Sequence, residues 1–436
     1  MIKFTNQQLL KEIKIERLGH ISFLLGIFLL ASALGIAIIF LLISLIISFS
    51  QKNNIFKDPW NYPFIASTLL MATSTLMHFN KYQYLSDLGI DPTLSLLGLV
   101  NWLPLFLCFF GFQRYLDSSK KRTLTAKLLI CGSIPVIFSG VLQLLNINGP
   151  FEFFEGLVVW FQKPYEDIGS ISGLFNNQNY AGLWMAMVWP FCLSSLLQTR
   201  KNFIKKLILV LICILFATFI SMTDSRNAIL GLIISSPIVM GNSSLLWYLP
   251  SIFLCFSILA LTVLPIFPNE LQLFMRSIVP SRIYTLFTDI GFENLTRYPR
   301  ISKWIAAFNF VLERPLFGWG AASFPILYQL KSGVWFGHAH NLPLELAISY
   351  GILPSLIIFI SYLTLLFLSF KKILDSAGTE KVISRLNEKA WFAASLIFFL
   401  SHLVDIQYFD ARISILCWIL LAGLRTSLKE ESSKLT

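Results

Sequence analysis

Charge is scarce in this sequence. Asp, Glu, Lys and Arg make up 13% of its 436 residues, about half of the share found in ordinary globular domains. Hydrophobic residues account for 56%, and the mean hydropathy is +0.70. Such a chain cannot cover its own surface with polar groups, so a soluble multidomain protein is excluded and a polytopic membrane protein is expected.

Cysteine pairs and a nucleic-acid-binding face are lacking too. The cysteines lie in apolar stretches without a C-x-x-C pair, which argues against a zinc site and favours small buried hydrophobic residues. The net charge of +11 is not gathered into a basic stripe interleaved with aromatic residues, so nucleic acid is not an expected partner. The six cysteines are Cys108, Cys131, Cys192, Cys213, Cys255 and Cys417.

Apolar windows of about 20 residues, the length of a spanning helix, recur from one end of the sequence to the other. The first apolar block, His20 to Ser50, is too long for one perpendicular helix and is interpreted as two short helices bent near Gly35. We therefore expect an all-α, polytopic transmembrane helical bundle of about twelve spans, forming a single integral membrane domain over residues 1–436. The other expected spans are 60–79, 95–116, 124–146, 178–198, 204–221, 226–243, 245–266, 341–369, 388–405 and 409–427.

The distribution of Lys and Arg predicts the orientation of these spans. With the first block as a hairpin, 23 of the 34 Lys and Arg residues fall on one side of the membrane. Short cytoplasmic loops collect these residues, so both termini are expected in the cytoplasm. One long loop, residues 268–340, is then expected on the periplasmic side.

The long loop contains an amphipathic helix at residues 300–313, where apolar residues recur at helical spacing and Lys303 falls on the polar face. We expect this helix to lie along the membrane surface. Arg300, which follows Arg297 and lies four residues before Trp304, would then meet a lipid phosphate at the boundary. An ordinary amphipathic anchor facing anionic lipid would show the same spacing.

Two polar clusters open expected spans on the outer side. The run from Ser172 to Tyr180 contains Asn176 and Asn179, whose amides could bind sugar hydroxyls, although a turn and a helix cap explain the same residues. A second cluster ends at Arg226, in the first turn of a helix, where a cation is unfavourable unless it binds a phosphate. The alternative is an interfacial arginine that reaches lipid head groups.

The last cluster opens the span after the long loop and contains His338, His340 and Asn341. A histidine at a membrane boundary can act as a general base near neutral pH. Two histidines could also chelate a metal, but the third ligand nearby, Glu345, lies a helical turn further on, so no metal site is expected. The alternative for Asn341 is that it is an N-cap without any further role.

Together these clusters favour a transfer reaction. Two arginines and one histidine on one membrane face could transfer a group from a lipid diphosphate to a hydroxyl, because cations neutralise the leaving diphosphate and a base deprotonates the acceptor. No Asp/Glu pair of the glycoside-hydrolase kind stands out on that face.

The order of these motifs resembles the O-antigen ligase and polymerase superfamily. The resemblance covers about Ser172 to Gly351 by motif and the rest of the chain by topology. Its motifs are SGLFNNQNYA from Ser172, TDSR ending at Arg226, Arg300-x-x-x-Trp304, ERPLFGWG ending at Gly320, HAHNL from His338, and the stretch from Glu345 to Gly351.

The resemblance implies an inverting, metal-independent glycosyltransferase without cofactors, in the cell inner membrane and with its active site facing the periplasm. The implied donor is a glycan on undecaprenyl diphosphate, and the acceptor is a lipid A core (ligase) or another glycan (polymerase). Arg226 and Arg300 would hold the diphosphate, and His340, directly before Asn341, would be the base. The residues expected to bind substrate are Asn176, Asn179, Arg297, Trp304, His338 and Asn341.

Two other classes of function stay open. Some relatives have been proposed to transport bicarbonate, but transport sites usually lie at the membrane midplane. Here Glu345, Asp405, Asp410 and Arg412 all fall near predicted helix ends. A purely structural membrane partner would leave the outer Arg and His residues without a function.

Overall fold

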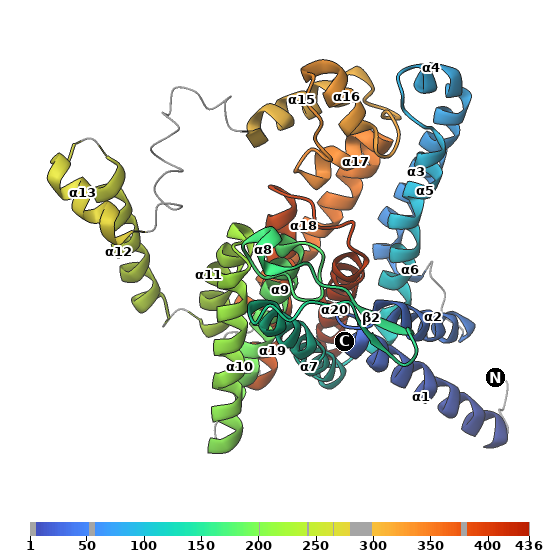
Figure 1. Cartoon of the computed structure of the whole chain (residues 1–436). Coiled ribbons are helices and arrows are strands. Elements are labelled where there is room, and N and C mark those ends of the chain that lie inside the picture. Colours follow the sequence, from blue (N-terminus) through green and yellow to red (C-terminus); the bar gives the residue numbers. More distant parts are fainter. Residues whose placement is uncertain are drawn as a thin grey trace.

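The computed structural model describes residues 6–51, 57–199, 201–241, 244–264, 266–279, 299–375 and 382–435. Helices dominate this part of the chain (Figure 1), which confirms the expected all-α class. A single short hairpin, β1 (Phe151–Phe153) paired antiparallel with β2 (Val158–Trp160), supplies the strands among the described residues.

The helices of the first half of the chain are α1 (Asn6–Leu29), α2 (Leu34–Ser50), η2 (Pro59–Asn61), α3 (Tyr62–Asn80), α4 (Tyr82–Asp87), α5 (Thr93–Gly98), η3 (Leu99–Asn101), α6 (Leu103–Phe112), η4 (Gln113–Tyr115), α7 (Ser119–Leu144), α8 (Tyr165–Ile168) and α9 (Gln178–Gln198). Those of the second half are α10 (Phe203–Met222), α11 (Arg226–Met240), α12 (Leu245–Val263), α13 (Asn269–Ile278), α15 (Pro299–Glu313), α16 (Ser323–Ser332), α17 (Leu342–Tyr350), α18 (Ile352–Asp375), α19 (Val382–His402) and α20 (Ala411–Leu435).

Seven helical segments among the described residues are long and apolar enough to cross a membrane, so the protein is polytopic. They are α7, α9, α10, α12, α18, most of α20, and the run from α5 to η4. The other five expected spans coincide with α1, α2, α3, α11 and α19. The first block is a hairpin, as expected: the chain turns between α1 and α2, and the two helices pack against each other.

Helices α9 and α20 lie in the centre of the bundle. In each, 78% of the apolar window is buried, and α9 packs against α10, α11 and α19 (Figure 1). A helix that is apolar on every face is covered either by other helices or by lipid, and α9 and α20 are covered by other helices. By contrast, only 6% of the window of α12 is buried, which suits a helix surrounded by lipid.

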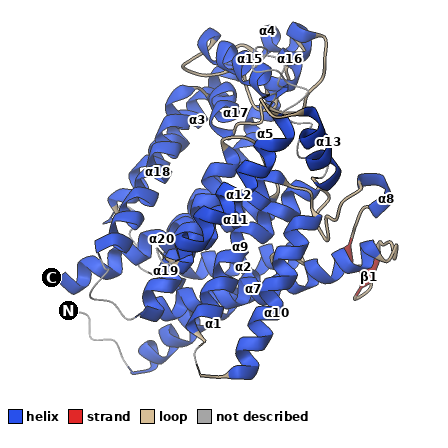
Figure 2. Ribbon diagram, turned by 90° about the vertical axis from the view of Figure 1, so that its left-hand side faces the viewer, coloured by secondary structure: helices blue, strands red, loops and turns tan. Residues whose placement is uncertain are grey.

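The bundle has two distinct ends. The start of α1 and the end of α20 lie at one end, which we call the termini side, whereas α15 and α16 lie at the other, the loop side (Figure 2). This arrangement agrees with termini on one side of the membrane and the long loop on the opposite side.

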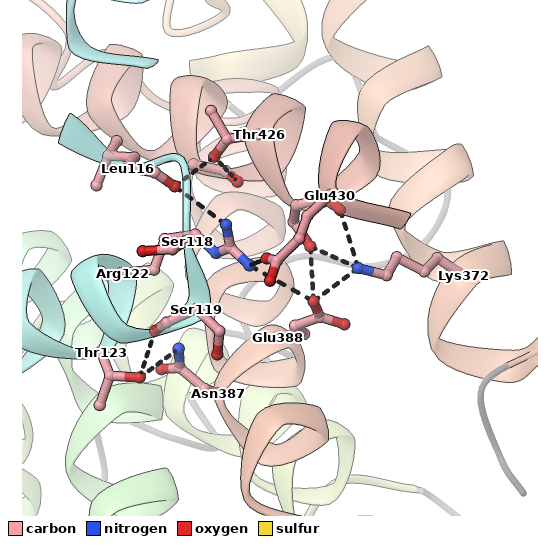
Figure 3. A network of polar contacts seen from close by, with 12 residues as sticks. Leu116, Ser118, Ser119, Arg122, Thr123, Lys372, Asn387, Glu388, Thr426 and Glu430 are labelled. Atoms are coloured by element: carbon pink, nitrogen blue, oxygen red, sulfur yellow. Dashed lines mark hydrogen bonds and ion pairs between the residues drawn. The ribbon is translucent and has the colours of Figure 1, made fainter. Parts of the chain in front are cut away.

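Buried charges join four helices on the termini side (Figure 3). Arg122 of α7 is 1% exposed and pairs with Glu430 of α20 at 2.7 Å. Lys372 of α18 pairs with Glu388 of α19 at 2.7 Å and donates hydrogen bonds to Ser427 of α20. Because every charge in this network has an opposite charge beside it, the cost of burial is offset locally.

The expected span at 341–369 is broken in two. Gly351 separates α17 from α18 with φ +97°, and a side chain there would overlap the carbonyl of Leu316. The ERPLFGWG segment runs alongside this break: Trp319 N–H donates to the Ile348 carbonyl at 2.7 Å, and Ile352 N–H donates to the Pro315 carbonyl at 2.8 Å. The motif therefore packs backbone against backbone, which excludes a continuous helix.

The amphipathic helix of the long loop, α15, exists but is oriented differently from the expectation. Lys303 was expected on the polar face, yet its side chain is 3% exposed and its Nζ lies 3.3 Å from the centre of the Phe336 ring. The face of Ile305, Phe308 and Leu312 is exposed and free to meet lipid. The prediction for Lys303 was wrong because α15 also packs against α16 and α17 and so buries a second face.

Candidate active site

His340 and Asp405 form the centre of the candidate site on the loop side. His340 lies in the loop before α17, and Asp405 lies in the connection between α19 and α20. Nδ1 of His340 is 2.8 Å from Oδ1 of Asp405. A carboxylate can only accept a hydrogen bond, so Nδ1 of His340 carries the donated proton.

The groups around Asp405 stabilise its ionised form. Burial alone would raise the pKa of this carboxyl, but hydrogen bonds from His340 and from the Ile406 N–H, together with the positive charge of Arg300, bring the pKa below its ordinary value. Gln407 Nε2 donates to the second oxygen at 3.0 Å. Asp405 is therefore an anion that can orient His340 and stabilise its protonated form.

Three contacts fix the backbone of His340, whose φ of +53° is unusual for a residue with a side chain. Asn341 caps α17 by accepting the Leu344 N–H at 2.9 Å, and its Nδ2 donates to the Leu403 carbonyl at 2.9 Å. Trp304 of α15 donates from Nε1 to the His340 carbonyl at 3.2 Å. Asn341 is thus an N-cap that also ties the His340 loop to the Asp405 connection.

His338 lies beside His340 but has different surroundings. The centres of the two rings are 4.2 Å apart, and the His340 N–H donates to His338 Nδ1 at 3.2 Å. Burial, and then the neighbouring His340, lower the pKa of His338 to about 4. His338 is therefore neutral at neutral pH, when it can exchange hydrogen bonds but cannot attract an anion by charge.

Two cations of α15 lie within electrostatic reach of this pair. Arg300 and Lys303 both affect the pKa of His338, and Arg300 helps to lower that of Asp405. Burial and the neighbouring Arg300 lower the pKa of Lys303. Arg300 is exposed, so its guanidinium is accessible to a ligand.

Arg226 is the first residue of α11, as expected, and its side chain is exposed. Ser225 occupies the N-cap position without a side-chain capping bond. Next to Arg226, Asn227 opens an apolar cleft of about 290 Å³ between α11 and α19. Leu403 and Val404, directly before Asp405, also line this cleft, whereas Arg226 does not line it.

The asparagine-rich run lies near the same connection. Asn177 caps α9 through the Asn179 N–H, and Asn176 is exposed. Arg412 holds this run in place: it donates to the Leu174 carbonyl at 2.7 Å and stacks over the Phe175 ring. The capping interpretation of the run is therefore correct, and Asn176 remains free for a ligand. Arg297 lies outside the described residues.

The chemistry of the donor set also permits a metal ion. One ligand atom from each of His338, His340 and Asp405 lies within 4.8 Å of the others. Glu345, the third ligand considered from the sequence, instead accepts the Ala339 N–H at 2.8 Å. Since the direct His340–Asp405 hydrogen bond already satisfies two of the three groups, we treat the pair as a proton-transfer site.

Two of these residues are not identified by the sequence motifs. Asp405 is visible in the sequence only as a charge near a helix end, because its partner His340 lies 65 positions away. The feature that could have identified Asp405 is an acidic residue in a short polar connection between two apolar helices. The sequence does not indicate that Lys303 is buried, because the helical periodicity places it on the polar face of the helix.

The fold and the site define a class: a polytopic helical membrane protein with a hydrogen-bonded His–Asp pair and nearby cations at one end of its bundle. Residues 209–360 match the protein-family model described as O-Antigen ligase. This match confirms the resemblance to the O-antigen ligase and polymerase superfamily, and its range includes Arg226, Arg300 and His340. No curated protein gives a significant match to the chain.

Proposed function

We propose that this protein is an O-antigen ligase-type glycosyltransferase. It would move a glycan from undecaprenyl diphosphate to a hydroxyl of a lipid A core, on the periplasmic side of the inner membrane. The observation that carries the proposal is the hydrogen bond between Nδ1 of His340 and Asp405, with Arg300 in electrostatic reach.

The transfer is a single displacement. His340 Nε2 takes the proton of the acceptor hydroxyl while the hydroxyl oxygen attacks the anomeric carbon of the donor. The bond from that carbon to the diphosphate oxygen breaks, and the diphosphate leaves with the electron pair, so the configuration at the carbon inverts. Asp405 stabilises the imidazolium that forms.

The arginines would neutralise the leaving diphosphate. Arg300 would approach from α15 and Arg226 from α11, and a guanidinium binds phosphate oxygens in a bidentate manner. The apolar cleft beside Arg226 suits the polyprenyl chain of the donor. Since these cations compensate the charge, we expect transfer to continue in the presence of a chelator.

The test is transfer by purified protein in nanodiscs, with a lipid-linked glycan as donor and a lipid A core as acceptor. We expect His340→Ala, Arg300→Ala and Arg226→Ala to lower the rate by about 100-fold or more, while Lys163→Ala, at an exposed cation outside the candidate site, leaves it unchanged. Full activity in all three site variants would contradict the proposal.

A polymerase, which would extend the glycan on its lipid carrier, shares the same site and family match. Surface polysaccharide from a deletion strain separates the two activities. Long chains that are not attached to lipid A indicate a ligase, whereas single repeat units indicate a polymerase.

A further inference from the structure

A second cavity lies on the other side of the two histidines. Its volume is about 430 Å³, within the range of small-ligand pockets. Its walls come from the α5–η3 segment, the start of α16, α17 and the connection before α20. We call it the His338 cavity, since His338 lines it.

The cavity has a polar end. Glu345 lines it next to His338, with one carboxyl oxygen held by the Ala339 N–H at 2.8 Å. Burial raises the pKa of Glu345 to about 7, whereas it lowers that of His338 to about 4. Near neutral pH this end therefore presents a half-protonated acid and a neutral imidazole. Such groups exchange hydrogen bonds with a hydroxyl and give no attraction for a diphosphate.

The opposite end is apolar and open. Leu97 is 62% exposed and Phe409 is 46% exposed, and both line the cavity. In the α5–η3 segment, Leu96 and Val100 lie next to residues that line the cavity, and both are also apolar and exposed. An opening rimmed by such residues in a membrane protein admits an amphiphile from the bilayer more easily than a free sugar from water.

The position of the cavity relates it to the transfer reaction. The imidazole ring of His338 lies between the polar end of the cavity and His340. The centres of the two imidazole rings are 4.2 Å apart. The apolar cleft beside Arg226 reaches the site through Leu403 and Val404, on the Asp405 side of His340. Two ligands could therefore approach the same imidazole from two directions.

We propose that the His338 cavity binds the acceptor, as the neutral, hydroxyl-bearing sugar of an amphiphilic glycolipid, with Glu345 and His338 as its hydrogen-bond partners. The inference rests on the proposed function and deepens it, because it assigns donor and acceptor to separate entrances. Glu345 and His338 would hold the sugar, and another of its hydroxyls would reach past His338 to His340, which does not itself line the cavity.

The experiment measures steady-state transfer in nanodiscs with the donor and the acceptor varied separately. Leu97→Trp narrows the mouth of the cavity, and Glu345→Gln changes its polar end without changing its size. We expect each variant to raise the KM for the lipid A core about tenfold, the effect of one lost or displaced contact, and to leave the KM for the donor unchanged. Leu96→Trp is the matched control, since Leu96 is similarly exposed but does not line the cavity.

A second measurement does not depend on turnover. In the His340→Ala background, binding of the lipid A core should weaken when Leu97→Trp is added, whereas binding of the lipid-linked donor should not. An unchanged acceptor KM and affinity in both cavity variants, or an effect confined to the donor, would overturn the inference. Absence of any transfer by the wild type would instead refute the proposed function.

Discussion

At the scale of single residues, the site depends on protonation states set by burial and by close partners. Asp405 is kept ionised by the groups that donate to it, and His338 is kept neutral by burial. Glu345 is the third such group, with a pKa raised to about 7 by burial. Three titratable groups from three different segments on the loop side thus have three different states near neutral pH, which is typical of catalytic sites.

Asp405→Asn tests whether Asp405 orients His340. An amide can donate to Nδ1 and select the wrong tautomer, which removes the lone pair from Nε2. We expect kcat to fall by about 100-fold or more, while the KM for the donor changes little. Asp87→Asn, at an exposed aspartate in α4, should have no effect. A variant with normal kcat would show that Asp405 is only structural.

The raised pKa of Glu345 makes stability depend on pH. Between its ordinary value of 4.5 and about 7, the folded protein binds more protons at this carboxyl than the unfolded chain does. The free energy of unfolding should therefore fall as pH rises through this interval, by about 3 kcal/mol in total. His338, which faces the same cavity, acts in the opposite direction, because its lowered pKa makes stability rise between about pH 4 and 6.5.

The measurement is thermal unfolding in detergent at a series of pH values. Glu345→Gln removes the carboxyl, so the difference between wild type and variant isolates its contribution. That difference should shift in favour of the variant as pH increases. A difference independent of pH would show that Glu345 titrates normally.

At the scale of elements, the site depends on a broken helix. The chain between α17 and α18 turns at Gly351, and the ERPLFGWG segment pairs with the backbone on both sides of the turn. The carbonyl of Phe317 also accepts hydrogen bonds from Ser74 and His78 of α3. These contacts at the break attach the loop side to the bundle. They hold α17, and the His340 loop precedes the N-terminus of this helix.

Gly351→Ala tests this role. The methyl group meets both a left-handed φ and the Leu316 carbonyl, so we expect a loss of more than about 2 kcal/mol together with reduced transfer. Gly333→Ala is the matched control, because Gly333 has φ +73° but nothing within 4 Å of an added Cβ. Its cost should be about 1 kcal/mol, as measured by thermal unfolding. Equal losses in the two variants would rule out backbone crowding at Gly351.

At the scale of the whole molecule, polar groups are concentrated at the two ends of the bundle. The His340 site lies on the loop side, and the network of Arg122, Lys372, Glu388 and Glu430 lies on the termini side (Figure 3). That network joins α7, α18, α19 and α20, so it stabilises the arrangement of helices that carries the connection containing Asp405.

A double-mutant cycle measures the coupling in this network. Glu388→Leu alone leaves Lys372 buried without its carboxylate partner at 2.7 Å, which should cost about 3–5 kcal/mol. Adding Lys372→Met removes the positive charge that Glu388 neutralised, so the double variant should be more stable than Glu388→Leu alone. Thermal unfolding provides the measurement. A double variant whose loss equals the sum of the single losses would mean that the two charges are not coupled.

The sequence by itself determined the class of fold and most of the spans, because apolar runs of fixed length are a local signal that lipid imposes on every spanning helix. It also identified His340, Arg300 and Arg226 as candidates, through ordered motifs. Only the tertiary structure paired His340 with Asp405, buried Lys303 and broke the expected span at Gly351. These features depend on contacts between segments far apart in the chain, and neither periodicity nor composition encodes which distant residue completes a hydrogen bond.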